Sequence, residues 1–252
     1  MNKIAMITGA TAGIGKAIAE KLAQNNFDLI ITGRRAHRLD ELEKELRNKY
    51  KIRALALSFD VQNRDECFKA IEKLPKDWNK IDILINNAGL AAGLETIQEG
   101  HFENWDRMID TNIKGLLNIT RIVSPAMIER KSGHIINIGS IAGKEVYPNG
   151  NVYCATKHAV DALTKAMRID MLEHNIKVTA IHPGMVETEF SIVRFDGDKQ
   201  KAKAVYEGLT PLFAEDIAEA VLFAVTRPPH VNINDMVIMP TAQASATIVK
   251  RD

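Results

Sequence analysis

The chain has 252 residues, of which 46% are hydrophobic and 26% are charged, as is typical of a soluble globular protein. Its 33 basic and 32 acidic side chains give a net charge of +1, so the bulk charge gives no support for binding to nucleic acid or to a membrane surface. No apolar run approaches the roughly 18 residues of a membrane span, and the amino terminus lacks a signal-peptide pattern. We therefore expect a cytoplasmic protein with no membrane or nucleic-acid partner. The two cysteines, Cys67 and Cys154, show neither a metal-site nor a disulfide pattern, so we expect reduced thiols and no metal ion.

Short apolar runs alternate with longer amphipathic stretches along the whole chain. In chain order, we predict strands at Ile4–Ile7, Asp28–Thr32, Ile52–Leu57, Ile83–Asn86, His134–Ile138, Lys177–Ile181 and Met236–Met239. We predict helices at Gly13–Gln24, His37–Asn48, Asp65–Leu74, Trp105–Arg130, Val152–His174 and Glu215–Thr226. Continuous apolar strands that alternate with helices are typical of a parallel α/β sheet covered on both faces. With right-handed crossovers, this order predicts a doubly wound sheet in a single domain over residues 1–252, because no linker-like segment divides the chain.

The least regular segment, Glu187–Thr210, follows the sixth predicted strand. Ligands of doubly wound sheets bind beyond the carboxyl ends of the strands. We therefore predict that this segment forms a partly mobile lid over a substrate.

A glycine-rich turn, Thr8–Gly15, connects the first predicted strand to the first helix. Glycines let the backbone turn tightly and approach a pyrophosphate, whose charge suits the amino terminus of a helix. The spacing is Gly-x3-Gly-x-Gly rather than the general Gly-x-Gly-x2-Gly, and an ordinary turn is the alternative interpretation. The place of the turn in the first strand–turn–helix unit favours a dinucleotide site. The predicted cofactor contacts here are Gly9, Thr11, Ala12, Gly13, Ile14 and Gly15.

The second predicted strand is followed by Arg34 and Arg35. An NAD-specific site usually has a carboxylate at this place for the ribose 2′-hydroxyl, whereas arginine accommodates the 2′-phosphate of NADP. Guanidinium groups bind phosphate through paired, charge-assisted hydrogen bonds. No acidic residue follows before Asp40, so we predict NADP as the cofactor. The alternative is a pair of solvated arginines at the start of a helix.

Two further strand ends point to the same groove. Asp60 and Val61 follow the third predicted strand, where the carboxylate is a candidate acceptor for the adenine amino group. Asn87, Ala88 and Gly89 follow the fourth, where asparagine tolerates unusual backbone angles and can connect adjacent loops. We predict that these five residues contact the cofactor, although each motif alone is also compatible with an ordinary turn.

Tyr153 and Lys157 stand four residues apart in a predicted helix, so both side chains reach one site. Free tyrosine has a pKa of about 10, which a neighbouring ammonium and a positively charged nicotinamide would lower toward the range of acid–base catalysis. Ser140 ends the fifth predicted strand and is a candidate to orient a substrate carbonyl. Asn112 lies in a predicted helix, where its amide is a candidate to hold a water molecule that links Lys157 to solvent. Taken alone, such a tyrosine–lysine pair also occurs by chance in many helices.

In their order and spacing, these motifs resemble the short-chain dehydrogenase/reductase family over essentially the whole chain. The matching segments are Thr8–Gly15, Asn86–Gly89, Asn112, Ser140, Tyr153-x3-Lys157 and Pro183-Gly184. The resemblance implies one Rossmann-type domain with a seven-stranded parallel sheet and a catalytic tetrad of Asn112, Ser140, Tyr153 and Lys157. It implies that Tyr153 is the general acid/base and that Lys157 also holds the nicotinamide ribose. It further implies nicotinamide contacts from Pro183, Gly184, Val186 and Thr188.

Within that family, the chain is similar to NADP-dependent 3-hydroxy acid dehydrogenases, which oxidise serine, L-allo-threonine and 3-hydroxypropionate-type acids or reduce malonic semialdehyde. The similar segments are Thr32–Arg35, Ile109–Asn112, His134–Ser140, Gly150–Tyr153, Glu189–Asp198 and His230–Asn234. Two departures lie beside the expected substrate: His182 stands where an acidic residue is expected before Pro183, and Met185–Glu189 is one residue short. The resemblance implies a 3-hydroxy acid as substrate, and the departures concern the substrate more than the reaction.

A 3-hydroxy acid needs a cation or several hydrogen-bond donors for its carboxylate. Arg194 in the predicted lid is our candidate, with amides such as Asn149 or Asn151 as further donors; a surface or subunit-interface arginine is the alternative. We also predict substrate contacts from Ser140 and Tyr153. Two other functions fit the same sequence features: a broad carbonyl reductase for diketones, ketoesters or oxoacyl thioesters, and a protein that senses NADP(H) without turnover. The resemblance also implies a homotetramer built through the helices Trp105–Arg130 and Val152–His174.

Overall fold

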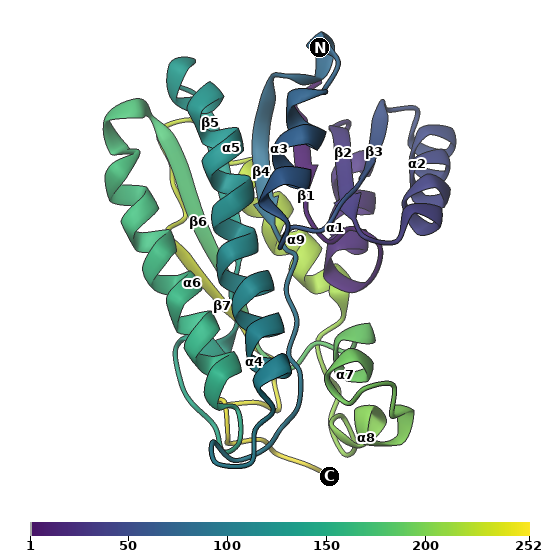
Figure 1. The fold of residues 1–252 in the computed structure, drawn as a ribbon, viewed down its shortest axis with the longest axis vertical. Helices are drawn as coiled ribbons and strands as arrows, with labels where there is room; N and C mark the ends of the chain where they lie inside the picture. Colours follow the sequence, from purple (N-terminus) through teal and green to yellow (C-terminus); the bar gives the residue numbers. More distant parts are fainter. Residues whose placement is uncertain (1) are drawn as a thin grey trace.

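A seven-stranded parallel sheet forms the centre of the molecule, as predicted (Figure 1). The computed structural model describes residues 2–252. The strands are β1 (Ile4–Ile7), β2 (Asp28–Gly33), β3 (Ala54–Ser58), β4 (Ile81–Asn86), β5 (Gly133–Ile138), β6 (Ile176–Pro183) and β7 (Asp235–Ile238). Their order across the sheet is β3-β2-β1-β4-β5-β6-β7. The direction of winding therefore reverses between β1 and β4, which is where doubly wound sheets bind ligands.

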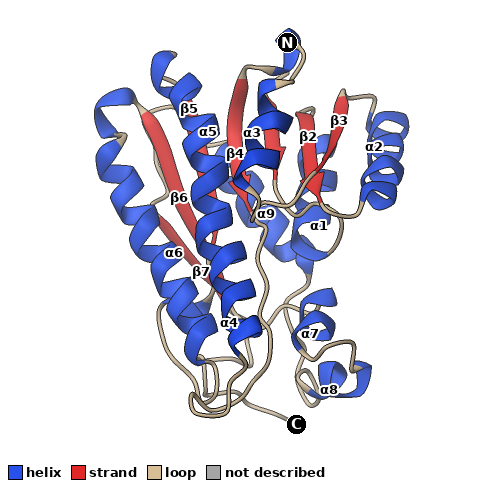
Figure 2. Ribbon diagram, viewed as in Figure 1, coloured by secondary structure: helices blue, strands red, loops and turns tan. Residues whose placement is uncertain are grey.

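Helices cover both faces of the sheet (Figure 2). The longer ones are α1 (Gly13–Gln24), α2 (Ala36–Tyr50), α3 (Arg64–Glu72), α4 (Phe102–Ile109), α5 (Leu116–Glu129), α6 (Asn151–Asp170) and α9 (Ala214–Val225). Shorter helical segments are η1 (Lys76–Trp78), η2 (Asp110–Gly115), η3 (Ile141–Gly143), η4 (Leu172–His174), α7 (Glu189–Arg194) and α8 (Lys199–Ala204). Helices α1 and α9 pack together on one face, and α3, α5 and α6 lie on the other. Within residues 2–252, no helix is both long and apolar enough to cross a bilayer.

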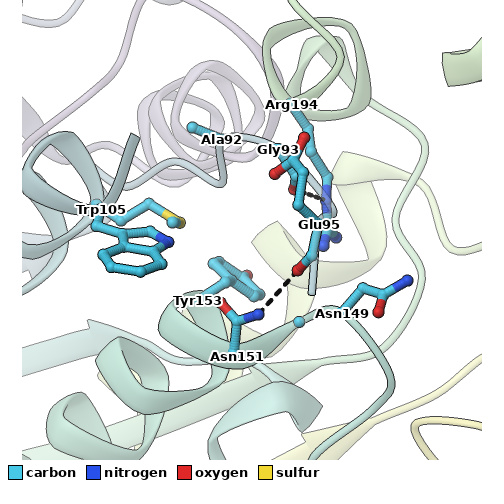
Figure 3. Close-up of a pocket in the computed structure, with 10 residues that line it drawn as sticks. Ala92, Gly93, Glu95, Trp105, Asn149, Asn151, Tyr153 and Arg194 are labelled. Atoms are coloured by element: carbon cyan, nitrogen blue, oxygen red, sulfur yellow. Dashed lines mark hydrogen bonds between the residues drawn. The ribbon is translucent and has the colours of Figure 1, made fainter. Parts of the chain in front are cut away.

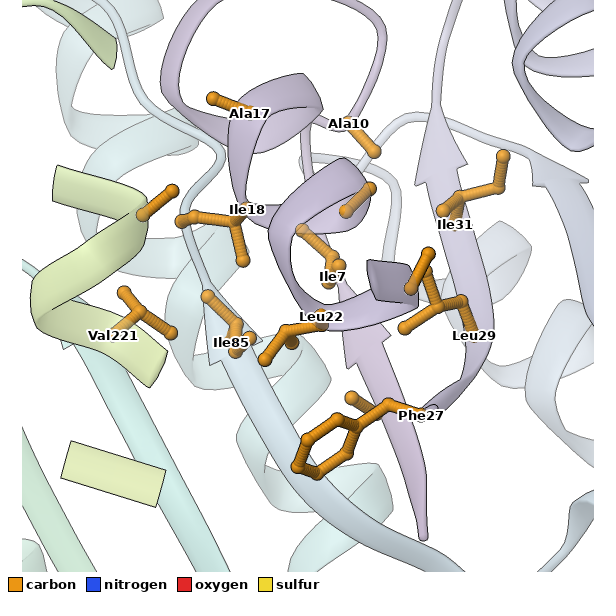
Figure 4. Close-up of a cluster of buried hydrophobic side chains, with 14 of the residues drawn as sticks. Ile7, Ala10, Ala17, Ile18, Leu22, Phe27, Leu29, Ile31, Ile85 and Val221 are labelled. Carbon is orange, nitrogen blue, oxygen red and sulfur yellow. The ribbon is translucent and has the colours of Figure 1, made fainter. Parts of the chain in front are cut away.

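Two apolar clusters, one on each face of the sheet, form most of the core. The first joins strand residues such as Ile7 and Ile85 to Ile18 of α1 and Val221 of α9 (Figure 4). The second joins the intervening strand residues, such as Leu84, to α3, α5 and α6. Because successive strand residues point to opposite faces, strands buried on both sides must be apolar throughout. This requirement explains why the central strands are continuous apolar runs in the sequence.

The predicted single helix Trp105–Arg130 consists of three segments, α4, η2 and α5. The middle segment, η2, is a π-helical turn, a wider turn that often marks a functional site. At its end, a Cβ added to Gly115 would lie only 2.7 Å from Cγ2 of buried Val61, so the backbone approaches the end of β3 closely. The prediction of one continuous helix was wrong here, because the apolar periodicity on either side of the turn masks a local change of pitch.

The predicted lid, Glu187–Thr210, contains the two short helices α7 and α8, which lie beyond the carboxyl ends of the strands (Figure 1). The last residues of the chain return to this segment. The backbone amide of Asp252 donates to the Gly208 carbonyl at 2.8 Å, and Arg251 Nη2 donates to the Val205 carbonyl at 3.1 Å. The lid is therefore held by the carboxyl-terminal residues as well as by its own helices.

Candidate active site

The glycine-rich loop between β1 and α1 has a backbone geometry that favours glycine. Gly9 and Gly13 have φ angles of +69° and +51°, in the left-handed region. A Cβ at Gly15 would lie 2.3 Å from the Gly9 carbonyl oxygen, so α1 packs directly against the loop. From the β4 side, Asn87 Nδ2 donates to the carbonyls of Thr8 and Gly9, at 2.9 and 3.2 Å. The loop is therefore fixed from two sides, and Asn87 connects adjacent loops as predicted.

The amino terminus of α1 is suited to bind an anion. Ala12 at the cap position offers no side-chain acceptor, and the first helical turn has no acidic residue. The first backbone N–H groups of the helix can therefore bind a phosphate. Thr188 of the lid lies opposite, with its Cβ 3.2 Å from the position of a Cβ at Gly13, while Ile14 packs against the core. This arrangement fits the pyrophosphate of a dinucleotide.

The two predicted arginines lie beside the same loop. Arg35 donates from Nε and Nη2 to the Thr11 hydroxyl, at 3.1 and 2.8 Å. Arg34 is exposed, and its Nη1 lies 3.5 Å from Oδ2 of Asp60. The Asp60 carboxylate also accepts a hydrogen bond from the backbone N–H of Gln62 at 3.0 Å. These contacts connect the carboxyl ends of β1, β2 and β3, where the cofactor ribose and adenine were predicted.

Arg38 and Glu189, for which no contact was predicted, belong to this cationic corner. Arg38 Nη1 donates to both Glu189 carboxylate oxygens, at 2.9 and 3.1 Å, and Arg35 Nη1 donates to Oε2 at 3.0 Å. Partial burial acts to raise the pKa of Glu189, but the two guanidinium groups hold it below its usual value. Arg38 had an available signal, since it lies three residues after Arg35 at the start of a helix. Glu189, 151 residues away, had none.

Asn112, Gly89 and Lys157 converge behind the loop. A Cβ at Gly89 would lie 3.2 Å from Asn112 Oδ1 and 3.5 Å from Lys157 Nζ. Asn112 Oδ1 accepts from the Leu90 amide at 2.8 Å, and its Nδ2 donates to the Leu90 carbonyl and the Thr156 hydroxyl, at 2.8 and 3.0 Å. Both amide hydrogens are thus used within the protein. The side chain fixes the loop after β4, and a water molecule in the predicted relay would have to bind other atoms.

Tyr153 lies on α6 and is almost completely buried. Burial and the neighbouring Tyr147 raise the pKa of the Tyr153 phenol above its usual value, whereas Ser140 and Arg194 act to lower it. With these protein neighbours, the phenol keeps its proton at neutral pH. A further positive charge is needed before this group becomes an effective base.

Lys157, one helical turn after Tyr153, is buried as well. Burial lowers the pKa of Lys157 to about 8. Its Nζ donates to the Ile138 carbonyl at 2.9 Å, at the end of β5. The amine is therefore fixed beneath the site by the same strand that presents Ser140.

Ser140 starts the short turn η3, and its Oγ accepts a hydrogen bond from the Ala142 amide at 3.1 Å. Beneath the turn lies fully buried His182, whose Nδ1 is 3.2 Å from the Ser140 carbonyl oxygen. Nε2 of His182 faces the carboxylates of Asp161 and Asp235, at 3.6 and 3.5 Å. His182, the residue that departs from the family pattern, therefore packs beneath the turn that follows Ser140 and contacts its backbone.

The segment after β6 closes one side of the site. Pro183 is the last residue of β6. A Cβ at Gly184 would lie 2.4 Å from Gln243 Oε1, and Val186 forms a bridge with Leu212. These close contacts fix the backbone at the predicted nicotinamide-binding positions. After β4, the backbone amide of Ala88 donates to the Thr8 hydroxyl at 3.0 Å, which connects this predicted cofactor contact to the glycine-rich loop.

A small pocket lies beside the Tyr153 ring (Figure 3). Its polar lining includes Glu95, Asn149, Asn151 and Arg194, and its apolar side includes Trp105. The pocket brings together two of the three predicted substrate contacts, Tyr153 and Arg194. Its polar character suits a small, charged substrate better than a large apolar one.

Arg194 is held at the pocket by groups that leave part of its guanidinium available. Its Nε donates to the Gly93 carbonyl at 3.2 Å, and its Nη1 donates to the Tyr147 hydroxyl at 3.0 Å. Cζ lies 5.8 Å from the centroid of the Tyr153 ring. Phe190, on the same helix α7, meets Tyr153 edge-on with ring centroids 5.7 Å apart. Phe190 lies in the segment Glu189–Asp198 that shares the family resemblance, whereas no sequence pattern had pointed to Tyr147.

The doubly wound sheet, the glycine loop at its switch point and the buried tyrosine–lysine pair together define a dinucleotide-dependent oxidoreductase. The family model for short chain dehydrogenase matches residues 3–199. The chain therefore belongs to the short chain dehydrogenase family, which confirms the resemblance seen in the sequence.

Similar proteins agree with this assignment. The chain is 48% identical, over 244 residues, to NADP-dependent 3-hydroxy acid dehydrogenase YdfG of Salmonella typhi, covering 96% of this chain and 97% of that protein. It is 43% identical, over 254 residues and the full length of both chains, to sulfoacetaldehyde reductase 2 of Chromohalobacter salexigens. A solved structure of the closed form of serine dehydrogenase with NADP+ superposes with a TM-score of 0.93 at 45% identity, covering 99% of this chain and 100% of that one. The cofactor predicted from Arg34 and Arg35 is the one named for the first and third of these proteins.

Proposed function

We propose that this protein uses NADP(H) to interconvert small 3-hydroxy acids and 3-oxo acids, such as serine, L-allo-threonine or 3-hydroxypropionate and their oxidised forms. The observation that carries the proposal is the position of Arg194, whose guanidinium shares a pocket with Tyr153 and lies 5.8 Å from its ring centroid. In a 3-hydroxy acid, one carbon separates the reacting carbon from the carboxylate. Such a molecule is short enough to contact both side chains at once.

NADP is supported by the chemistry of the corner where the adenosine end would lie. Arg35 and Arg38 offer two guanidinium groups beside the phosphate loop, and arginine is the preferred partner of a 2′-phosphate. The free N–H groups at the start of α1 fit the pyrophosphate. When bound, NADP+ accepts a hydride from the substrate carbon.

Tyr153 acts as the acid/base in this proposal. In oxidation, its Oη takes the proton of the substrate hydroxyl, and in reduction it returns a proton to the carbonyl oxygen. Because burial raises the pKa of this phenol, the positive charges of Lys157 and of an oxidised nicotinamide are needed to favour the phenolate. Ser140 binds the same substrate oxygen through Oγ, and Asn112 fixes the loop that faces the pair.

Steady-state oxidation of L-serine, L-allo-threonine and 3-hydroxypropionate, each with NADP+ and NAD+, tests the proposal. Tyr153→Phe removes the proton carrier and is expected to lower kcat/KM by about a hundredfold or more. Arg194→Ala removes a charged hydrogen-bond partner and is expected to raise KM for the acids by about tenfold or more. Uncharged alcohols serve as the control, because their KM does not depend on a cation.

Each other outcome selects a different function. Tyr153-dependent reduction of a diketone without turnover of the acids would support the broad carbonyl reductase. NADP(H) binding without turnover of any substrate would support the sensing protein. Equal losses for acids and alcohols in Arg194→Ala would remove the carboxylate-binding role.

Arg194 is also suited to a second class of substrate, the sulfonated aldehydes. Malonic semialdehyde and sulfoacetaldehyde both have one methylene between the carbonyl carbon and the anionic group, and a guanidinium binds either anion. The similarity to a sulfoacetaldehyde reductase over the full chain supports this candidate. Reduction of both aldehydes with NADPH, by wild type and Arg194→Ala, compares the two classes directly. If only the sulfonate is reduced, the carboxylic acid class is wrong.

We also propose that the protein works in the cytoplasm as a homotetramer. Apolar side chains on the helices expected at an interface are exposed in the single chain, among them Leu117 of α5 and Ile169 of α6. Both cysteines are free thiols, which suits a reducing compartment. Light scattering on the purified 28.0 kDa chain tests the assembly, and a monomeric mass would overturn the tetramer. Recovery of the protein outside the cytosolic fraction of cells would overturn the compartment.

A further inference from the structure

Glu189 occupies the place where an anion from the cofactor would be expected. Its two carboxylate oxygens accept three hydrogen bonds of 2.9–3.1 Å from Arg35 and Arg38. Arg35 also contacts Thr11 of the phosphate loop through two hydrogen bonds. A carboxylate from the lid thus satisfies the arginine pair.

A 2′-phosphate and the Glu189 carboxylate would compete for the same hydrogen-bond donors of Arg35 and Arg38. Both are anions that seek the same guanidinium hydrogens, and a phosphate monoester carries about −1.5 to −2 charges at neutral pH. When two anions lie a few ångströms apart, each opposes the binding of the other. Binding of the 2′-phosphate therefore requires Glu189 to give up some or all of its hydrogen bonds.

The lid helix makes this exchange relevant to the substrate side. Glu189 is the first residue of α7 and Arg194 is the last, so the helix is about 9 Å long at 1.5 Å per residue. Phe190 contacts the Tyr153 ring and Arg194 lines the pocket. The contact at Glu189 and the groups that face the pocket therefore belong to one short helix.

We propose that Glu189 is an internal competitor of the NADP 2′-phosphate, and that its release from Arg35 and Arg38 couples NADP binding to the lid helix α7. NAD+ has a hydroxyl in place of the phosphate and leaves the Glu189 contacts intact. The two cofactors thus produce different states of α7, although their nicotinamide ends are identical. This inference goes beyond the proposed substrate class, because it concerns the cofactor and the lid helix α7 and not the identity of the substrate.

Equilibrium binding of NADP+ and NAD+ to substrate-free protein, followed by calorimetry at low ionic strength, tests the competition. In Glu189→Gln, NADP+ is expected to bind about threefold to tenfold more tightly, because a half-exposed ion pair with two partners is lost as a competitor. NAD+ affinity is expected to stay within about twofold by the same reasoning. Arg38→Gln is expected to weaken NADP+ binding and to leave NAD+ binding unchanged.

Glu187→Gln is the matched control. Glu187 is exposed two residues earlier in the same segment, and its carboxylate forms no ion pair in the described part of the chain. The substitution removes one negative charge from the lid and leaves the arginine pair untouched. It is expected to change NADP+ affinity by less than twofold, roughly, because an exposed charge near a dianion is screened by solvent.

Several results would overturn the inference. Weaker NADP+ binding in Glu189→Gln would mean that Glu189 organises the arginines for the phosphate. Unchanged binding, or an equal change for both cofactors, would mean that there is no competition, as would an Arg38→Gln variant with unaltered NADP+ affinity. If the wild-type chain itself shows no preference for NADP+, the proposed cofactor is wrong, which is a separate failure.

Hydrogen exchange measures the coupling independently. In wild type, the amides of residues 190–194 are expected to exchange faster in the NADP+ complex than in the NAD+ complex, because the contact at Glu189 is broken only by the phosphate. In Glu189→Gln, the two complexes are expected to exchange alike. Equal exchange in the two wild-type complexes, or a difference that persists in the variant, would refute the coupling.

Discussion

Lys157 is a buried amine, and its pKa is lowered to about 8 by that burial. Between this value and its usual value of 10.5, the unfolded chain binds more protons at this group than the folded chain does. Below pH 8, keeping this buried amine protonated lowers the free energy of unfolding. The free energy of unfolding therefore increases as the pH rises from 8 toward 10.5. From pH 7.5 to 9.5 the increase amounts to about 2 kcal/mol.

Urea unfolding of the cofactor-free protein checks this expectation. We expect the free energy of unfolding of wild type, relative to that of Lys157→Met, to increase by about that amount over this pH range. The comparison cancels the titration of other groups. Parallel pH profiles for the two proteins would mean that Lys157 titrates normally in the fold.

Single residues were predictable where sequence spacing encodes a shared face or a strand end. Tyr153 and Lys157 follow from a helical repeat, and Ser140 follows from its place after an apolar run. Glu189 was not predictable, because its partners Arg35 and Arg38 are brought to it only by the packing of the lid on the cofactor edge. The hydrogen-bond partners of Asn112 were also hidden, since the water relay was argued from an ordinary helix.

At the scale of elements, the π-helical turn η2 is the clearest departure from expectation, and it contains Asn112, a predicted member of the catalytic tetrad. Asn112→Ala would leave the backbone amide and carbonyl of Leu90 without their partners in a buried region. Each buried group left unpaired costs about 1–3 kcal/mol, so we expect the free energy of unfolding to fall by about 2–6 kcal/mol. Chemical denaturation measures this loss directly. A loss well under about 1 kcal/mol would show that the clamp contributes little.

The seven strands and most helices were predictable because their apolar patterns are long and regular. The boundaries were less accurate: the third strand begins at Ala54 rather than Ile52, and α6 ends at Asp170 rather than His174. The lid helices α7 and α8 have six residues each, too few to give a periodic signal. The helices of the predicted lid are thus the elements that the sequence reveals least.

For the whole molecule, the cofactor binds the folded state and not the unfolded chain, so its binding raises the free energy of unfolding. At a cofactor concentration a hundred times the Kd, the free energy of unfolding rises by about 2.7 kcal/mol, which corresponds to a Tm increase of about 5–10 °C for a chain of this size. We expect NADP+ to raise the Tm more than NAD+ at the same concentration, because the phosphate adds contacts with Arg35 and Arg38. Thermal unfolding by calorimetry checks this order, and equal shifts would contradict it.

The return of the chain end to the lid has a practical consequence for handling the protein. The backbone amide of Asp252 and the guanidinium of Arg251 bind carbonyl groups of the segment between α8 and α9. The amino-terminal end emerges at the opposite end of the molecule (Figure 1). An affinity tag or fusion partner joined after Asp252 would start beside the predicted lid, whereas one joined at the front of the chain would be remote from it. Kinetic work and crystallisation are therefore better served by an amino-terminal tag.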